Sequence, residues 1–149
     1  MRGFTLIELL IAIAIIVLIT VLGISAFSRY NSGQVLKSEA SRTVALLSDA
    51  RARTLASKHD SRYGVHFESD RAILFQGSTY VPGDEQNEIM HLHPRATFST
   101  ALSDGGVDVI FSRISGDTDQ SGSVTLRRDG GAETRTVIID QSGIAYVEE

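Results

Sequence analysis

The first part of the chain is dominated by apolar side chains. No polar residue occurs from Leu9 to Ile19, and the wider stretch from Phe4 to Ala26 is interrupted only by Thr5, Glu8, Thr20, Gly23 and Ser25. As a helix rising about 1.5 Å per residue, this stretch measures roughly 35 Å, which is enough to cross a bilayer. The pattern therefore predicts a transmembrane helix over residues 4–27.

Glu8 is unusual for such a segment. A carboxylate in the first turns of a membrane helix costs about 2.5–3.5 kcal/mol on insertion scales, and such a group usually has a partner. A cleaved signal peptide does not need it, although Gly23-Ile24-Ser25-Ala26 resembles a cleavage site. A plain anchor does not need it either, unless Glu8 simply lies at the level of the lipid headgroups.

The segment from Gly3 to Ile11 reads Gly-Phe-Thr-Leu-Ile-Glu-Leu-Leu-Ile. It resembles the class III signal of type IV pilins and type II secretion pseudopilins. The resemblance implies that residues 1–3 are a leader, which a prepilin peptidase removes after Gly3 before it N-methylates Phe4. It further implies a single-pass protein of the bacterial inner membrane with its head outside the cytoplasm. The implied partners are other pilins or pseudopilins, an assembly platform and an ATPase.

The spacing between Phe4 and Glu8 also has a chemical reason that does not depend on the resemblance. Cleavage before Phe4 creates an amine four residues ahead of Glu8, and an amine and a carboxylate in an apolar medium are far less costly as a pair than alone. Within one helix the N-terminal end of the dipole favours an anion rather than a cation. A staggered neighbouring subunit can instead bring its Phe4 amine to Glu8, which makes both residues candidates for filament assembly.

Two features depart from the usual pattern of that family. The leader Met1-Arg2-Gly3 is short and weakly basic. Basic residues also follow the apolar segment, beginning at Arg29, so the positive-inside bias is weak. Either translation begins upstream of Met1 or a dedicated recognition step sets the orientation.

Beyond the apolar segment the period of the hydrophobic residues is that of an amphipathic helix. Leu36, Ala40, Val44, Leu47 and Ala50 follow one another at spacings of four, four, three and three residues. The first proline is Pro82, so one helix can continue from the membrane to about Ser57. We expect the stripe to be covered by a sheet.

From Tyr63 the pattern alternates with a period of two, which predicts strands. A turn-rich segment lies at Gly77–Glu88. The expected strands cover Tyr63–Phe67, Ala72–Phe75, Ile89–His93, Val107–Arg113, Ser123–Arg128, Thr134–Asp140 and Ile144–Val147. The fold class is α+β: a long N-terminal helix whose stem packs on an antiparallel sheet, with residues 28–149 forming the stem and head.

The head carries a second, less specific resemblance. Ala50-Arg51, Phe111-x-x-Ile114-x-Gly116 and Ser142-Gly143 are similar to positions in H-type minor pseudopilins and FimT-like minor pilins. This similarity implies a minor component rather than a major pilin subunit.

Charge and composition exclude several classes of protein. The chain has no cysteine, so it has no disulfide framework and no thiolate chemistry. Its net charge is −4; residues 27–62 carry a net +4 and residues 63–149 a net −8. An acidic head argues against nucleic-acid binding. Three arginines that could contact phosphates, Arg127, Arg128 and Arg135, lie among acidic residues, so charge compensation is the simpler interpretation.

Two segments resemble metal sites. Asp117-x-Asp119-x-Ser121-Gly122 matches the first half of a calcium loop, but Arg128 occupies the position of the expected glutamate. Calcium would need a third acidic ligand such as Asp104 or Asp108, and an ordinary turn is the simpler reading. His91 and His93 would share a strand face, although solvated histidines explain them as well.

No catalytic constellation is present, so we do not expect an enzyme. The sequence favours a minor pilin or pseudopilin, a structural subunit of a type IV pilus or type II secretion pseudopilus. The alternatives are a minor pilin that binds DNA during uptake and a periplasmic binding module on an uncleaved anchor.

Overall fold

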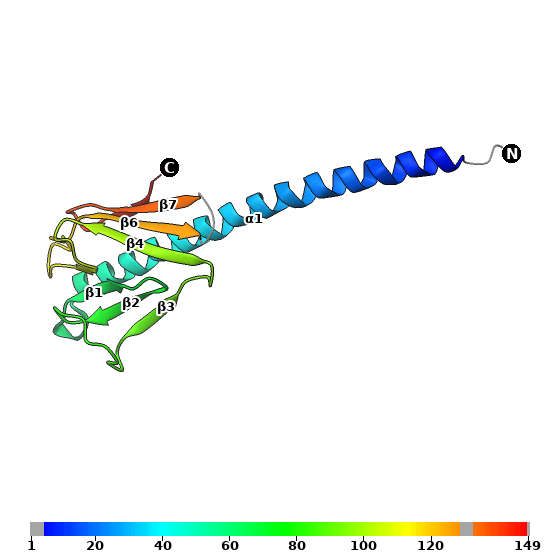
Figure 1. The fold of residues 1–149 in the computed structure, drawn as a ribbon. Coiled ribbons are helices and arrows are strands. Elements are labelled where there is room, and N and C mark those ends of the chain that lie inside the picture. Colours follow the sequence, from blue (N-terminus) through cyan, green and yellow to red (C-terminus); the bar gives the residue numbers. More distant parts are fainter. Residues whose placement is uncertain (1–4, 129–132, 149) are drawn as a thin grey trace. The chain divides into compact units, whose positions relative to one another are not determined.

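A computed structural model describes residues 5–128 and 133–148, without the side chains of residues 22–32 and 58 (Figure 1). It contains the helix α1 (Leu6–Leu55), a short 3-10 turn η1 (Lys58–Asp60) and eight strands. The chain divides into two compact units, Met1–Gln34 and Val35–Glu149. The α+β class is therefore confirmed.

The first unit consists of the N-terminal part of α1. Its large apolar side chains from Leu6 to Val21 are all exposed, with exposed fractions between 50% at Ile13 and 76% at Leu6. In the part of the chain that the structure describes, no helix meets the length and apolarity required to span a membrane. The membrane span over residues 4–27 stays a prediction.

The second unit begins with the stem, the part of α1 from Val35 onward. Leu36, Ala40, Leu47 and Ala50 are at most 1% exposed, and Val44 packs against the same core. The predicted stripe is confirmed, and α1 ends two residues before Ser57. Ser57, His59 and Asp60 then adopt positive φ angles of 50–56°, which turn the chain out of the helical path.

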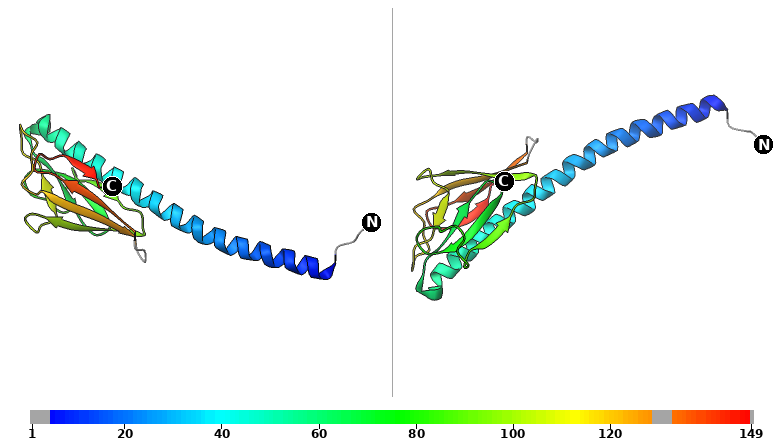
Figure 2. Two further views of the ribbon diagram at one scale, coloured as in Figure 1. Left: turned by 90° about the horizontal axis from the view of Figure 1, so that it is seen from above. Right: turned by 60° about the horizontal axis from the view of Figure 1, so that its bottom comes forward.

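The head contains two antiparallel sheets, whereas the sequence predicted one. The first sheet has the order β3-β2-β1-β5, with β1 (Tyr63–Phe67), β2 (Arg71–Gln76), β3 (Glu88–His91) and β5 (Asp108–Ile110). The second has the order β4-β6-β7-β8, with β4 (Ala96–Leu102), β6 (Gly122–Arg128), β7 (Thr134–Ile139) and β8 (Ala145–Val147). Figure 2 shows both sheets beside the stem, drawn in cyan and green.

Strand β4 was missed by the sequence interpretation, and it is the strand that builds the second sheet. Ala96, Phe98 and Leu102 are buried and alternate with serine and threonine, so the period of two exists but few large apolar residues carry it. β6 pairs with β4 along its whole length, and these three side chains pack in the same core cluster as the stem. The predicted strand at Val107–Arg113 is correspondingly shorter, because Ser112 already turns to donate its N–H to the carbonyl of Asp117 at 2.7 Å.

One core joins the stem to both sheets. Phe67 in β1 and Phe98 in β4 meet edge to face, with ring centroids 5.3 Å apart and planes at 77°. Val65, Val109, Val124 and Val137 are fully buried around the same cluster as the stem residues. The helix cannot bury the apolar stripe of the stem by itself, and residues of both sheets bury it.

Arg53 links the C-terminal end of the stem to the first sheet. Its guanidinium donates to Asp49 Oδ2 at 2.7 Å and to both carboxylate oxygens of Glu88, which is the first residue of β3. The hydrogen bonds to Glu88 and then to Asp49 raise the pKa of Arg53 above its ordinary value. These contacts of Arg53 therefore attach the stem to the start of β3.

Candidate functional site at the start of the helix

The sequence-predicted assembly residue Glu8 lies in the first turn of α1, where the chain makes an N-cap. Thr5 precedes the helix, and its Oγ1 accepts the N–H of Glu8 at 3.3 Å. The carbonyl of Thr5 accepts the N–H of Leu9 at 3.2 Å. This is the geometry by which a threonine satisfies helix N–H groups that have no intrahelical partner.

The sequence interpretation overlooked this cap, although its signal was present. Thr5-x-x-Glu8 is the pattern of a capping box, in which a Glu three residues after the cap faces the open end of the helix. A carboxylate at that position also interacts favourably with the positive end of the helix dipole. Glu8 therefore has a local role in starting α1, in addition to any role in assembly.

The surroundings of Glu8 are apolar. Its described neighbours along the helix, Leu6, Ile7, Leu9 and Leu10, are 55–76% exposed, and Glu8 is itself exposed. Gly3 and Phe4, the predicted processing site, lie outside the described residues. Pairing between Glu8 and the Phe4 amine of a neighbour remains a prediction.

The loop proposed for calcium turns its carboxylates outward. Asp117 and Asp119 are exposed, whereas Thr118 between them is 3% exposed and donates its hydroxyl to Gln120 Oε1 at 3.3 Å. The same Gln120 oxygen accepts the N–H of Ile110 at 3.2 Å. The inward-facing positions of this loop are thus Thr118 and Gln120, and their hydrogen bonds attach the loop to β5.

The other acidic and histidine residues considered as metal ligands do not come together in one site either. Asp108 Oδ1 is hydrogen-bonded to His66 Nδ1 at 2.5 Å. The His66 ring stacks on the Tyr80 ring, with ring centroids 3.9 Å apart. His93 lies beyond the end of β3, contrary to the expectation that it shares a strand face with His91. Among the residues for which positions are described, no three His, Asp or Glu side chains are grouped to hold a metal ion.

The three arginines considered for phosphate binding divide between two faces of the second sheet. In an antiparallel pair, residues directly opposite share a face. Arg128 pairs with buried Ala96 and Arg135 with buried Leu126, whereas Arg127 pairs with exposed Thr134 and so lies on the other face. The structure does not unite them in one basic patch.

Comparison with known proteins adds one match. Residues 1–24 match the family model of the prokaryotic N-terminal methylation motif. The match includes Gly3, Phe4 and Glu8, and it supports membership of the type IV pilin and pseudopilin family and processing by a prepilin peptidase. No curated protein and no solved structure matches the chain.

Proposed function

We propose that the chain is a minor pilin or pseudopilin, a structural subunit of a type IV pilus or a type II secretion pseudopilus. The observation that carries the proposal is the match of residues 1–24 to the prokaryotic N-terminal methylation motif, and Gly3, Phe4 and Glu8 lie within this segment. The exposed apolar side chains of α1 support it, because such a surface needs lipid or neighbouring helices to cover it.

In this proposal a prepilin peptidase cleaves after Gly3 and methylates the new amine of Phe4. The helix over residues 4–27 holds the precursor in the bacterial inner membrane, with residues 28–149 outside the cytoplasm. An assembly platform and its ATPase then transfer the subunit into a filament. There the apolar helices bundle with those of other pilins, and the heads pack outside.

The proposed role of Glu8 is to fix the register of one subunit against the next. Thr5 satisfies the N–H of Glu8 through its side-chain oxygen, and that bond leaves the carboxylate itself available. A methylated amine from a staggered neighbour would pair with this carboxylate. Because each charge is costly alone in an apolar filament core, the pair favours one axial stagger.

The proposed work is architectural, and neither catalysis nor DNA binding is part of it. The arginines that could contact phosphates lie on different sheet faces, and the head carries a net −8. A binding module on an uncleaved anchor is the remaining competitor. Such a module does not need Gly3, Phe4 and Glu8 at these fixed spacings.

The test is the N-terminus of the protein after expression with and without a prepilin peptidase. Intact-mass spectrometry should show a chain that begins at N-methylated Phe4 only when the peptidase is present. Gly3→Val should abolish cleavage, whereas Gly33→Val, a matched change outside the motif, should not. An intact Met1 in the presence of the peptidase, or a terminus near Phe27, would contradict the proposal.

A further inference from the structure

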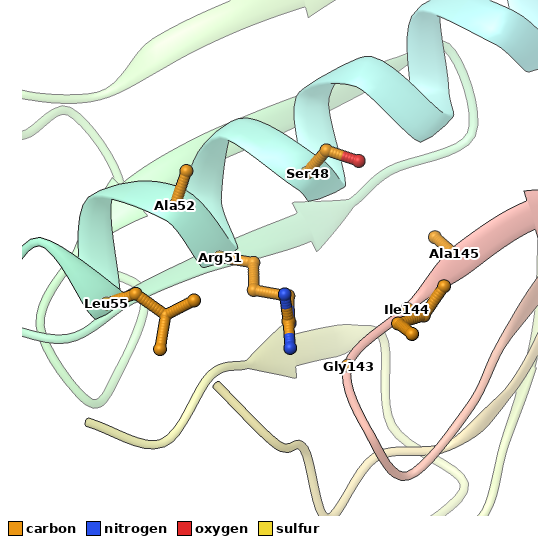
Figure 3. Close-up of a pocket in the computed structure, with 7 residues that line it drawn as sticks. All are labelled: Ser48, Arg51, Ala52, Leu55, Gly143, Ile144 and Ala145. Carbon is orange, nitrogen blue, oxygen red and sulfur yellow. The ribbon is translucent and has the colours of Figure 1, made fainter. Parts of the chain in front are cut away.

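A groove separates the stem from the edge of the second sheet. It has a volume of about 190 Å³, and its walls are Ser48, Arg51, Ala52 and Leu55 on one side and the segment Gly143–Ala145 on the other (Figure 3). All of these residues belong to the second compact unit. The groove therefore lies where β8, an edge strand, begins at Ala145.

The free edge of β8 begins at this groove, where Ala145 lines it. Glu148 donates its N–H to the carbonyl of Thr136 at 2.8 Å, and Ile144 accepts the N–H of Asp140 at 3.0 Å. In an antiparallel ladder such pairs alternate, so the backbone groups of Ala145 and Val147 point away from β7. Within the described part of the chain, the N–H groups of these two residues have no acceptor. Such an edge is a template for another strand.

Arg51 stands at the end of the groove where β8 begins. Its Nε donates to the carbonyl of Gly116 at 3.0 Å, which fixes the guanidinium. Among the described residues its two terminal nitrogens make no hydrogen bond and no ion pair. Gly116 and Gly143 both have φ angles of 72°, and a Cβ on Gly143 would lie 2.0 Å from the Gly116 carbonyl oxygen. Only glycines allow the two turns to meet beside this arginine.

The helix side of the groove leaves room for a strand. Ser48 and Ala52 are exposed and small, and Leu55 is 39% exposed. A backbone paired to β8 lies about 4.8 Å from it, over these residues. Leu55 and exposed Ile144 would then cover its apolar side chains.

We propose that the edge of β8 binds the extended C-terminal segment of a partner protein, which adds as an antiparallel strand and places its terminal carboxylate on Arg51. An antiparallel strand ends where β8 begins, so its carboxylate arrives at the guanidinium. A parallel strand would bring an N-terminal amine there, and the like charges would repel. The Gly116 turn lies against Gly143 at that end, which favours a chain that terminates over one that continues.

This inference goes beyond the proposed function, because it concerns a surface of the head and not the packing of N-terminal helices. It uses two recognition elements that occur together in known peptide-binding domains: strand addition for affinity and capture of a terminal carboxylate for direction. A second copy of this chain is the less suitable occupant, since two heads of net charge −8 repel each other.

The experiment uses the full chain, purified in detergent micelles and immobilised. It is exposed to a pool of random heptapeptides with free C-terminal carboxylates and to the same pool with C-terminal amides. We expect the free-acid pool to be retained at least about tenfold more strongly, which is the usual effect of a charge-assisted hydrogen bond. A third pool, amidated but ending in glutamate, distinguishes a side-chain carboxylate from a terminal one.

Three variants test the geometry. Arg51→Gln should lower retention of the free-acid pool about tenfold, whereas a matched change at an exposed arginine of β7, Arg135→Gln, should leave it unchanged. Ala145→Pro removes a free-edge N–H at the first residue of the strand, where proline is tolerated, and should abolish retention. Melting curves must show that each variant is folded.

The proposal is overturned if the wild-type chain retains neither pool or retains both equally. It is also overturned if the glutamate-terminated amide pool is retained as strongly as the free-acid pool. Sedimentation supplies a further decisive outcome: a wild-type dimer that Ala145→Pro dissociates, with no peptide retained, assigns the edge to a second copy instead.

Discussion

Thr54 joins the last buried turn of the stem to the first strand of the head through Tyr63. Its Oγ1 accepts the N–H of Tyr63 at 2.9 Å and donates to the carbonyl of Ala50 at 2.9 Å. Thr54 is fully buried, so neither group has water as an alternative partner. The hydroxyl therefore fixes where β1 begins relative to α1.

Replacing Thr54 by valine keeps the shape of the side chain and removes this hydroxyl. The N–H of Tyr63 is then left buried without a partner, which should lower the free energy of unfolding by about 1–3 kcal/mol. Thr54→Ser keeps the hydroxyl and should cost less. Thermal unfolding of the two variants measures the difference, and equal losses would show that packing, not the hydrogen bond, matters at this position.

Gly64 lies in β1 between two neighbours that leave no space for a side chain. A Cβ would stand 2.6 Å from Phe75 Cζ and 2.8 Å from the carbonyl oxygen of Val109, and Phe75 is buried. Gly64→Ala should therefore destabilise the head by about 1–3 kcal/mol, as overpacking does. Gly106→Ala meets only the exposed side chain of Asp104 and should change stability by less than about 0.5 kcal/mol. A tolerated Gly64→Ala would contradict the close approach of β1, β2 and β5.

Ile114 is a β-branched residue with a positive φ of 77°, and it is 93% exposed. The left-handed conformation costs an L-residue roughly 1–2 kcal/mol, and an exposed side chain gains no burial to offset it. Asparagine tolerates this conformation, so Ile114→Asn should raise the free energy of unfolding by about 0.5–1 kcal/mol. Val81→Asn, at a loop position that is 56% exposed and lacks a positive φ, should have little effect. The prediction fails if both changes act alike in denaturant melts.

Glu8 is predicted to act in filament assembly and not in membrane insertion. Glu8→Ala removes the insertion cost but leaves the amine of a neighbour unpaired in an apolar core, so it should reduce incorporation into filaments. Glu8→Gln keeps size and hydrogen bonding and should give an intermediate result. The measurement is the ratio of filament-associated to membrane-associated protein.

The N-cap provides the matched control for this series. Thr5→Ala removes the side-chain acceptor for the Glu8 N–H and should destabilise the start of the helix by about 1 kcal/mol while leaving the carboxylate in place. If Glu8 acts by pairing with the Phe4 amine of a neighbour, the Thr5→Ala protein should assemble nearly normally. If the role is only to start the helix, Thr5→Ala and Glu8→Ala should impair assembly equally.

The sequence by itself determined the features that depend on local pattern. An uninterrupted apolar run without proline, followed by a stripe of period 3.6, was enough to predict the single helix that the structure describes as α1. The register of Gly3, Phe4 and Glu8 likewise appears within one short segment, and the methylation motif matched there. Local patterns of this kind depend on residues a few positions apart, so they can be read directly from the chain.

The tertiary structure decided the features that depend on pairing between distant segments. Strand β4 carries few large apolar residues, and it became a strand because β6 pairs along its whole length. The pairing of β4 with β6, and not with the strands of the first sheet, also divided the head into two sheets. The groove beside β8 depends on Arg51 meeting Gly116, which is 65 residues away in the chain. Strand pairing and burial are set by contacts between distant residues, and no local period encodes which segments will meet.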